Sequence, residues 1–115
     1  MAENKLADMS TEFAVQILSV TDGIKGHYFL ANQLERSGTS IGANINEANY
    51  GQSKADFVSK MHIALKETAE TEYWLKLLTM SEYITEEMGK SLLNDCLEIK
   101  RMLIASINTA KESTK

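Results

Sequence analysis

Four stretches of this sequence repeat apolar residues every three or four positions, and only short breaks separate them. That spacing places the apolar side chains along one face of an α-helix. The chain contains no proline, so no helix interior loses a backbone hydrogen-bond donor to that residue. No alternation of period two is long enough to predict a strand. The pattern therefore predicts an all-α protein.

The breaks and the capping residues set the expected helix bounds. The first helix is predicted from about residue 4 to 21, and the second from about Tyr28 to Asn49. Ser53, with an acidic residue three positions later, predicts the start of a third helix over about Lys54–Tyr83. Thr85 and the two glutamates after it predict the start of a fourth.

Short connections between consecutive helices make sequential helices antiparallel neighbours. The predicted architecture is therefore an antiparallel up-down-up-down four-helix bundle. The chain of 115 residues is the length of one ordinary domain, so we expect a single domain over residues 1–115.

Composition and charge narrow the function classes. The net charge is −4, and the basic residues are scattered, with only Lys100 and Arg101 adjacent. Autonomous nucleic-acid binding needs basic residues gathered on one face, which this pattern does not indicate. The N-terminal residues are charged, no apolar run has the length of a membrane span, and Cys96 is the single cysteine. We therefore expect a cytoplasmic protein with no membrane association.

Two glycines lie four positions apart inside the second predicted helix. Gly38 and Gly42 each cost a helix interior roughly 1 kcal/mol relative to alanine. Close approach of a neighbouring helix to the bare backbone would offset that cost, and we favour this interpretation. A weak, bent helix is the alternative.

The third and fourth helices carry more apolar residues than one core-facing stripe needs. A second apolar surface on a soluble protein usually contacts another subunit, so we predict self-association. The alternative is a wide core-facing sector on each helix. The predicted interface residues are Ile63, Trp74, Leu77, Leu93, Leu97 and Ile104.

Glu72 is an acidic residue within the apolar sector of the third helix. A buried carboxylate is costly unless it is paired, and Arg36 offers a planar fork that binds a carboxylate through two bonds. One hypothesis is a polar network that joins the second and third helices through Arg36, Asn44 and Glu72, with Ser40 and Glu47 on the same flank. The other is that Glu72 reaches solvent and pairs with Lys76, one turn on.

The sequence offers no arrangement typical of catalysis, cofactor binding or a metal site. His27 and His62 are far apart and lack the partners that a di-iron or zinc site requires. Cys96 falls in the apolar stripe of the fourth helix and is predicted to be a small core residue. Glu67, Glu70 and Glu72 form a carboxylate-rich turn, and such runs usually lie on a solvated face. We predict no enzyme activity and no small-molecule substrate.

The segment 33–48, QLERSGTSIGANINEA, resembles the signature of the bacterial four-helix bundle family, the 23S ribosomal RNA intervening-sequence proteins. The similarity continues through Ser53, Asp56-Phe57, residues 60–67, Glu70-Thr71 and residues 73–78, and it spans about Phe13 to Ile107. The resemblance implies a small cytoplasmic bundle that assembles as a ring-shaped homopentamer. It supplies no catalytic residue.

Two functional hypotheses follow. The first is a non-enzymatic, self-assembling bundle that acts as a scaffold or partner-binding module. The second is an accessory protein that binds ribosomal RNA or another nucleic acid through an oligomeric ring, in which basic residues from several copies converge. The residues to follow for the second hypothesis are Lys54, Lys60, Lys66, Lys100 and Arg101.

Overall fold

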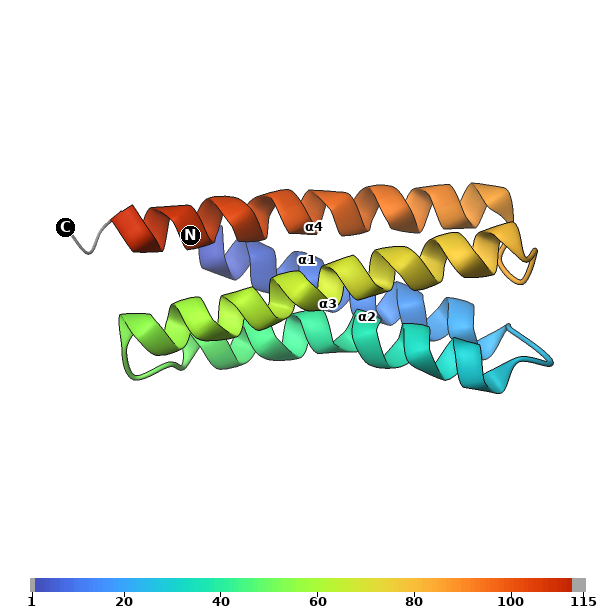
Figure 1. Ribbon diagram of the computed structural model, residues 1–115, viewed down its shortest axis with the longest axis horizontal. Helices are drawn as coiled ribbons and strands as arrows, with labels where there is room; N and C mark the ends of the chain where they lie inside the picture. The colour runs from blue at the N-terminus through green and yellow to red at the C-terminus, as the bar shows by residue number, and fades with distance from the viewer. Residues whose placement is uncertain (1, 113–115) are drawn as a thin grey trace.

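The structure is a computed structural model that describes residues 2–112, with side chains from residue 5 onward. Its elements are α1 (Ala2–Asp22), α2 (Tyr28–Asn49), α3 (Lys54–Met80) and α4 (Glu86–Glu112). Figure 1 shows the chain reversing direction at each connection, so the start of α1 and the end of α4 lie at the same end of the bundle. The predicted four-helix bundle is thus confirmed, as a rod of 50 × 21 × 19 Å. None of the described helices is both long and apolar enough to span a bilayer.

Each helix packs against two neighbours. Within the described residues, the backbones of α2 and α4 both approach those of α1 and α3, whereas no Cα atoms of α1 and α3, or of α2 and α4, lie within 8 Å of each other. The four helices therefore stand at the corners of a square, and their buried stripes meet along its axis. This core extends from Leu6 in α1 to Ile107 in α4 and includes Cys96, which is fully buried as predicted.

The predicted caps form at the starts of α3 and α4. The Ser53 hydroxyl accepts a hydrogen bond from the backbone N–H of Asp56 at 3.1 Å. The Thr85 hydroxyl accepts one from the N–H of Met88 at 3.2 Å. Each hydroxyl satisfies a donor that has no partner within its helix, which fixes where the helix begins.

The predicted end of α3 is wrong by three residues: the helix ends at Met80, not at Tyr83. Glu82 has a φ of +67°, in the left-handed region, and this ends the helical path. The backbone N–H groups of Tyr83 and Ile84 then both donate to the carbonyl of Leu78, at 2.9 and 3.3 Å. Ile84 is buried, so this turn is held to the core by an apolar side chain as well as by hydrogen bonds.

The close packing predicted at the α2 glycines is confirmed. A Cβ atom added at Gly38 would lie 3.0 Å from two side-chain carbons of Ile17, and one added at Gly42 would lie 3.2 Å from the Ser10 hydroxyl. Ile17 and Ser10 belong to α1, and both are fully buried. The missing side chains therefore let α1 approach the α2 backbone, which offsets the low helix propensity of glycine.

Candidate functional site

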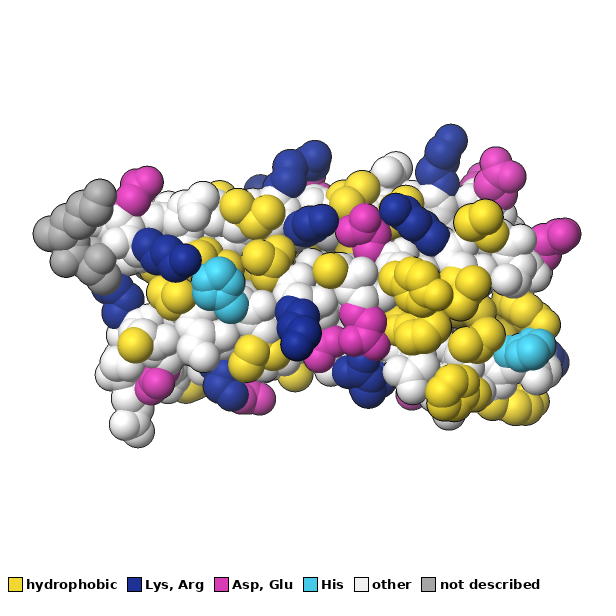
Figure 2. All heavy atoms as spheres, in the orientation of Figure 1, with side chains coloured by type: hydrophobic (Ala, Val, Ile, Leu, Met, Phe, Trp, Pro, Cys, Tyr) yellow, Lys and Arg dark blue, Asp and Glu magenta, His cyan; other side chains and the backbone are white. Residues whose placement is uncertain are grey.

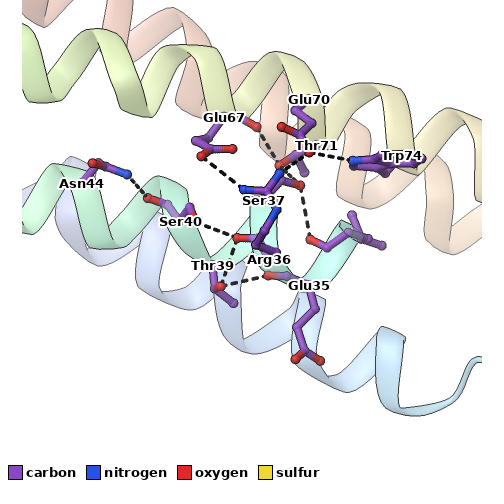
Figure 3. Close-up of polar contacts among 11 residues, drawn as sticks. Glu35, Arg36, Ser37, Thr39, Ser40, Asn44, Glu67, Glu70, Thr71 and Trp74 are labelled. Carbon is purple, nitrogen blue, oxygen red and sulfur yellow. Dashed lines mark hydrogen bonds and ion pairs between the residues drawn. The ribbon is translucent and has the colours of Figure 1, made fainter. Parts of the chain in front are cut away.

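An arginine on α2 contacts two carboxylates on α3. Arg36 Nη1 lies 3.4 Å from Glu67 Oε2, and Arg36 Nη2 bonds Glu70 Oε2. Trp74 Nε1 donates a hydrogen bond of 3.0 Å to the same Glu70 oxygen. Figure 3 shows these side chains meeting in the space between the two helices. We call Arg36, Glu67, Glu70 and Trp74 the polar junction.

The polar junction changes the acidity of its members. The pKa of Glu70 is lowered, first by the hydrogen bond from Trp74 and then by the bond to Arg36. The hydrogen bond to Glu70 raises the pKa of Arg36. Glu67 has a largely buried side chain, and its Oε1 atom has no hydrogen-bond partner among the described residues. The junction thus gathers two carboxyl groups around one guanidinium.

A buried pair of hydroxyls lies beside the polar junction. Thr71 Oγ1 lies 2.9 Å from Ser37 Oγ, and both residues are fully buried. Thr71 Oγ1 also bonds the Glu67 carbonyl, at 2.8 Å within its own helix. Buried hydroxyls without partners would be costly, so this pairing favours one alignment of α2 against α3.

The predicted network through Arg36, Asn44 and Glu72 is not the arrangement found. Asn44 donates to the carbonyl of Ser40 within α2, at 2.9 Å. Glu72 instead lies 3.5 Å from Lys76 Nζ, as the alternative hypothesis expected, and 3.4 Å from Lys100 Nζ on α4. The physical reason is the helical repeat of about 100° per residue, which turns Glu72 away from the flank of Glu67 and Glu70 toward α4.

The remaining two network residues have other contacts. Ser40 donates to the Arg36 carbonyl at 2.7 Å. Glu47 pairs with Lys60 on α3 at 2.8 Å, so it does join α2 to α3 but by its own ion pair. Ion pairs therefore join α3 to each of its two neighbours, α2 and α4, at different positions along the bundle.

Sequence reasoning missed the carboxylates that Arg36 contacts. Glu67 and Glu70 were expected on a solvated face, yet only 18% of the Glu67 side chain and 36% of that of Glu70 is exposed. The available signal was the spacing of Glu67, Glu70 and Trp74 at i, i+3 and i+7, which puts all three on one flank of α3.

An apolar surface adjoins the polar junction. Figure 2 shows hydrophobic side chains gathered over the C-terminal end of α3 and the nearby start of α2. The exposed members include Phe29 at 71%, Tyr73 at 58% and Met80 at 83%. Beside them, Met80 and Leu93 line a groove of about 230 Å³ between α3 and α4.

The six predicted interface residues differ in how exposed they are. Ile63 and Ile104 are 40% and 41% exposed. The other four, Trp74, Leu77, Leu93 and Leu97, are partly covered by their own chain. Tyr73 and Met80 are more exposed than any of the six and were not predicted. Their helical positions continue the same outward face of α3.

Substitution of Trp74 by phenylalanine should raise the pKa of Glu70 toward its ordinary value of 4.5, because the ring is kept and the indole N–H is lost. A carbon-detected NMR titration of the Glu70 carboxyl measures this change. Tyr73→Phe is the matched control, since it leaves the indole donor in place. An unchanged Glu70 pKa in Trp74→Phe would contradict the assigned cause.

Outside the polar junction, the described side chains of the cysteine and of His27 have simple surroundings. Within residues 5–112, no three His, Cys, Asp or Glu side chains are placed to hold a metal ion together. Burial raises the pKa of the Cys96 thiol to about 12, with a contribution from the nearby Glu72, so the reactive thiolate is disfavoured. His27 packs edge-on against Tyr83, with ring centroids 4.8 Å apart.

These features define a class of small helical bundle with a charged junction between two helices and an exposed apolar side. The model of the 23S rRNA-intervening sequence protein family matches residues 2–105, and the chain belongs to that family. A solved structure from Bacteroides thetaiotaomicron, a protein of unknown function from the S23 ribosomal protein family, is similar to this chain with 49% identity and a TM-score of 0.88. The match covers 94% of this chain and 99% of that one. A search of curated proteins gave no match.

Proposed function

We propose that this protein is a non-enzymatic, self-associating helical bundle that acts as a scaffold or partner-binding module. The observation that carries the proposal is the outward face of α3, where Tyr73 and Met80 are exposed at 58% and 83%. A bundle helix that faces water on its outer side needs no apolar residues there. A contiguous apolar surface on a soluble protein is typical of a contact with another protein.

Self-association also accounts for the position of the polar junction. The junction lies on the flank of the same helix, where Glu70 and Trp74 contact each other. Apolar centres with polar rims are the usual composition of protein interfaces. We expect the assembled form to be the pentamer that the family resemblance implies.

Nucleic-acid binding is the less favoured function. Among the basic residues on which it depends, Lys60, Lys100 and Arg101 pair with carboxylates of the same chain. Each such pair reduces the positive charge available to phosphates. Binding to ribosomal RNA fragments that weakens steeply with salt would favour this second function.

Light scattering on the purified chain tests self-association. We expect a mass several times the 12.8 kDa of one chain at micromolar concentration. Tyr73→Glu, which places a charge at the centre of the apolar face, should shift the equilibrium toward the monomer. Tyr50→Glu is the control, because Tyr50 is 88% exposed but lies at the end of α2, outside the apolar face of α3. A wild-type chain that stays monomeric across this range would overturn the proposal.

A further inference from the structure

The outer face of α1 carries a second exposed apolar patch. Val15 and Leu18 are 61% and 47% exposed, although α1 needs only its core-facing stripe to hold the bundle. Asp8 and Asp22 are also exposed, and their spacing from Val15 places them on the same outward face, one at each end of the patch. The outer face of α1 is therefore apolar in the middle and acidic at both ends.

The outer face of α3 carries both apolar and basic residues. Tyr73 and Met80 are exposed at 58% and 83%, and Leu77 lies between them along the helix, on the same side. Lys66 and His62, both exposed, continue the same face toward the start of the helix. This face is apolar at its C-terminal end and basic at its N-terminal end.

The two faces point in opposite directions. α1 and α3 each pack against α2 and α4, and in the part of the chain that the structure describes their own Cα atoms do not come within 8 Å of each other, so they occupy diagonal corners of the bundle. Two copies that paired through α3 alone would leave Val15 and Leu18 in water. Pairing of one face with a different face on the next copy covers both patches.

The contacts that α1 and α3 make with α2 show which of their residues lie at the same position along the bundle axis, which we call the same height. Ser10 of α1 packs at Gly42, and Thr71 of α3 packs at Ser37. Because α3 runs antiparallel to α2, the residue of α3 opposite Gly42 lies about five positions before Thr71, close to Lys66. Lys66 therefore lies at the height of Ser10, between the two exposed carboxylates Asp8 and Glu12.

We infer that the α3 outer face of one copy packs on the α1 outer face of the next, with Tyr73 against Leu18 and with Lys66 against Asp8 and Glu12. The inference rests on the proposed self-association and names the two surfaces that meet. If neighbouring copies are related by a rotation about an axis parallel to the bundle, residues of α1 and α3 at the same position along that axis lie opposite each other. Apolar contact in the middle and opposite charges toward one end specify one orientation.

Two variants and their mixture test this contact. Leu18→Glu and Tyr73→Glu each place a carboxylate on one face, and each alone should raise the dissociation constant at least about tenfold. Mixed together, they should form one-to-one dimers, because the first keeps an intact α3 face and the second an intact α1 face. Native mass spectrometry, with one variant isotopically labelled, counts the copies. Circular dichroism confirms that each variant remains helical.

The outcomes separate this inference from the function on which it rests. Dimers in the mixture, with monomers of each variant alone, support contact between α1 and α3. If Leu18→Glu assembles like the wild type, or if the mixture stays monomeric, the inference is overturned while self-association stands. A monomeric wild type overturns both.

Discussion

Replacement of Gly38 by valine is expected to lower the free energy of unfolding by about 2–3 kcal/mol. A Cβ at this position would lie 3.0 Å from two carbons of the Ile17 side chain, which is fully buried. Valine adds two further methyl groups to that contact, and overpacking of a filled core typically costs about 1–3 kcal/mol. The change must move α1 away from α2 or force Ile17 out of its rotamer.

Urea unfolding followed by circular dichroism measures the effect of Gly38→Val. Ala43→Val is the matched control, since it puts the same side chain on the exposed face of the same helix. The control should lose only the difference in helix propensity, about 0.6 kcal/mol. A Gly38→Val protein as stable as the control would mean that α1 and α2 are not in close contact at this point.

This contact is among the features that the sequence made predictable. Apolar spacing defined α2 with the observed bounds, Tyr28–Asn49, because amphipathic periodicity is a local property of the chain. Two glycines inside that helix required compensation from outside it, and Ile17 and Ser10 provide it. The starts of α3 and α4 were likewise predictable from their capping residues, because a cap needs only a side-chain hydroxyl and a backbone N–H three residues later.

The end of α3 was less predictable for a physical reason. Helical periodicity continues through Tyr83, and neither glycine nor proline interrupts it. The helix nevertheless ends because Glu82 adopts a positive φ and Ile84 is buried in the core. That outcome depends on the burial of Ile84 against the other helices, which the helical periodicity through Tyr83 does not reveal.

The polar contacts show the same limit. A helical wheel identifies the flank on which each polar residue lies, but it does not state which neighbouring helix covers that flank. One of the two hypotheses paired Glu72 with residues of α2, yet Glu72 contacts Lys76 on its own helix and Lys100 on α4, while Arg36 contacts Glu67 and Glu70. The need of a buried carboxylate for a partner was predictable from desolvation alone. The choice of partner required the arrangement of the helices.

Cys96 was assigned to the core correctly, and its burial leads to the second large expected effect. Burial, and then the charge of Glu72, raise the pKa of its thiol from an ordinary value of 9.0 to about 12. The unfolded chain therefore begins to lose this proton near pH 9, whereas the folded chain keeps it until about pH 12. Between these values deprotonation stabilises only the unfolded state, so the stability of the fold decreases as pH rises.

From pH 8 to pH 11, this single thiol should remove about 2–3 kcal/mol from the free energy of unfolding, at about 1.4 kcal/mol for each pH unit above 9. Lysine and tyrosine side chains titrate in the same range, so the measurement is a comparison with Cys96→Ala. The variant lacks the thiol but retains the other groups, including Lys100 and Asp95 beside it. Urea unfolding at both pH values should therefore give a smaller loss of stability for Cys96→Ala than for the wild type. Equal losses in the two proteins would mean that water reaches the thiol in the folded state, and that the centre of the bundle between α3 and α4 is less tightly packed than its buried side chains indicate.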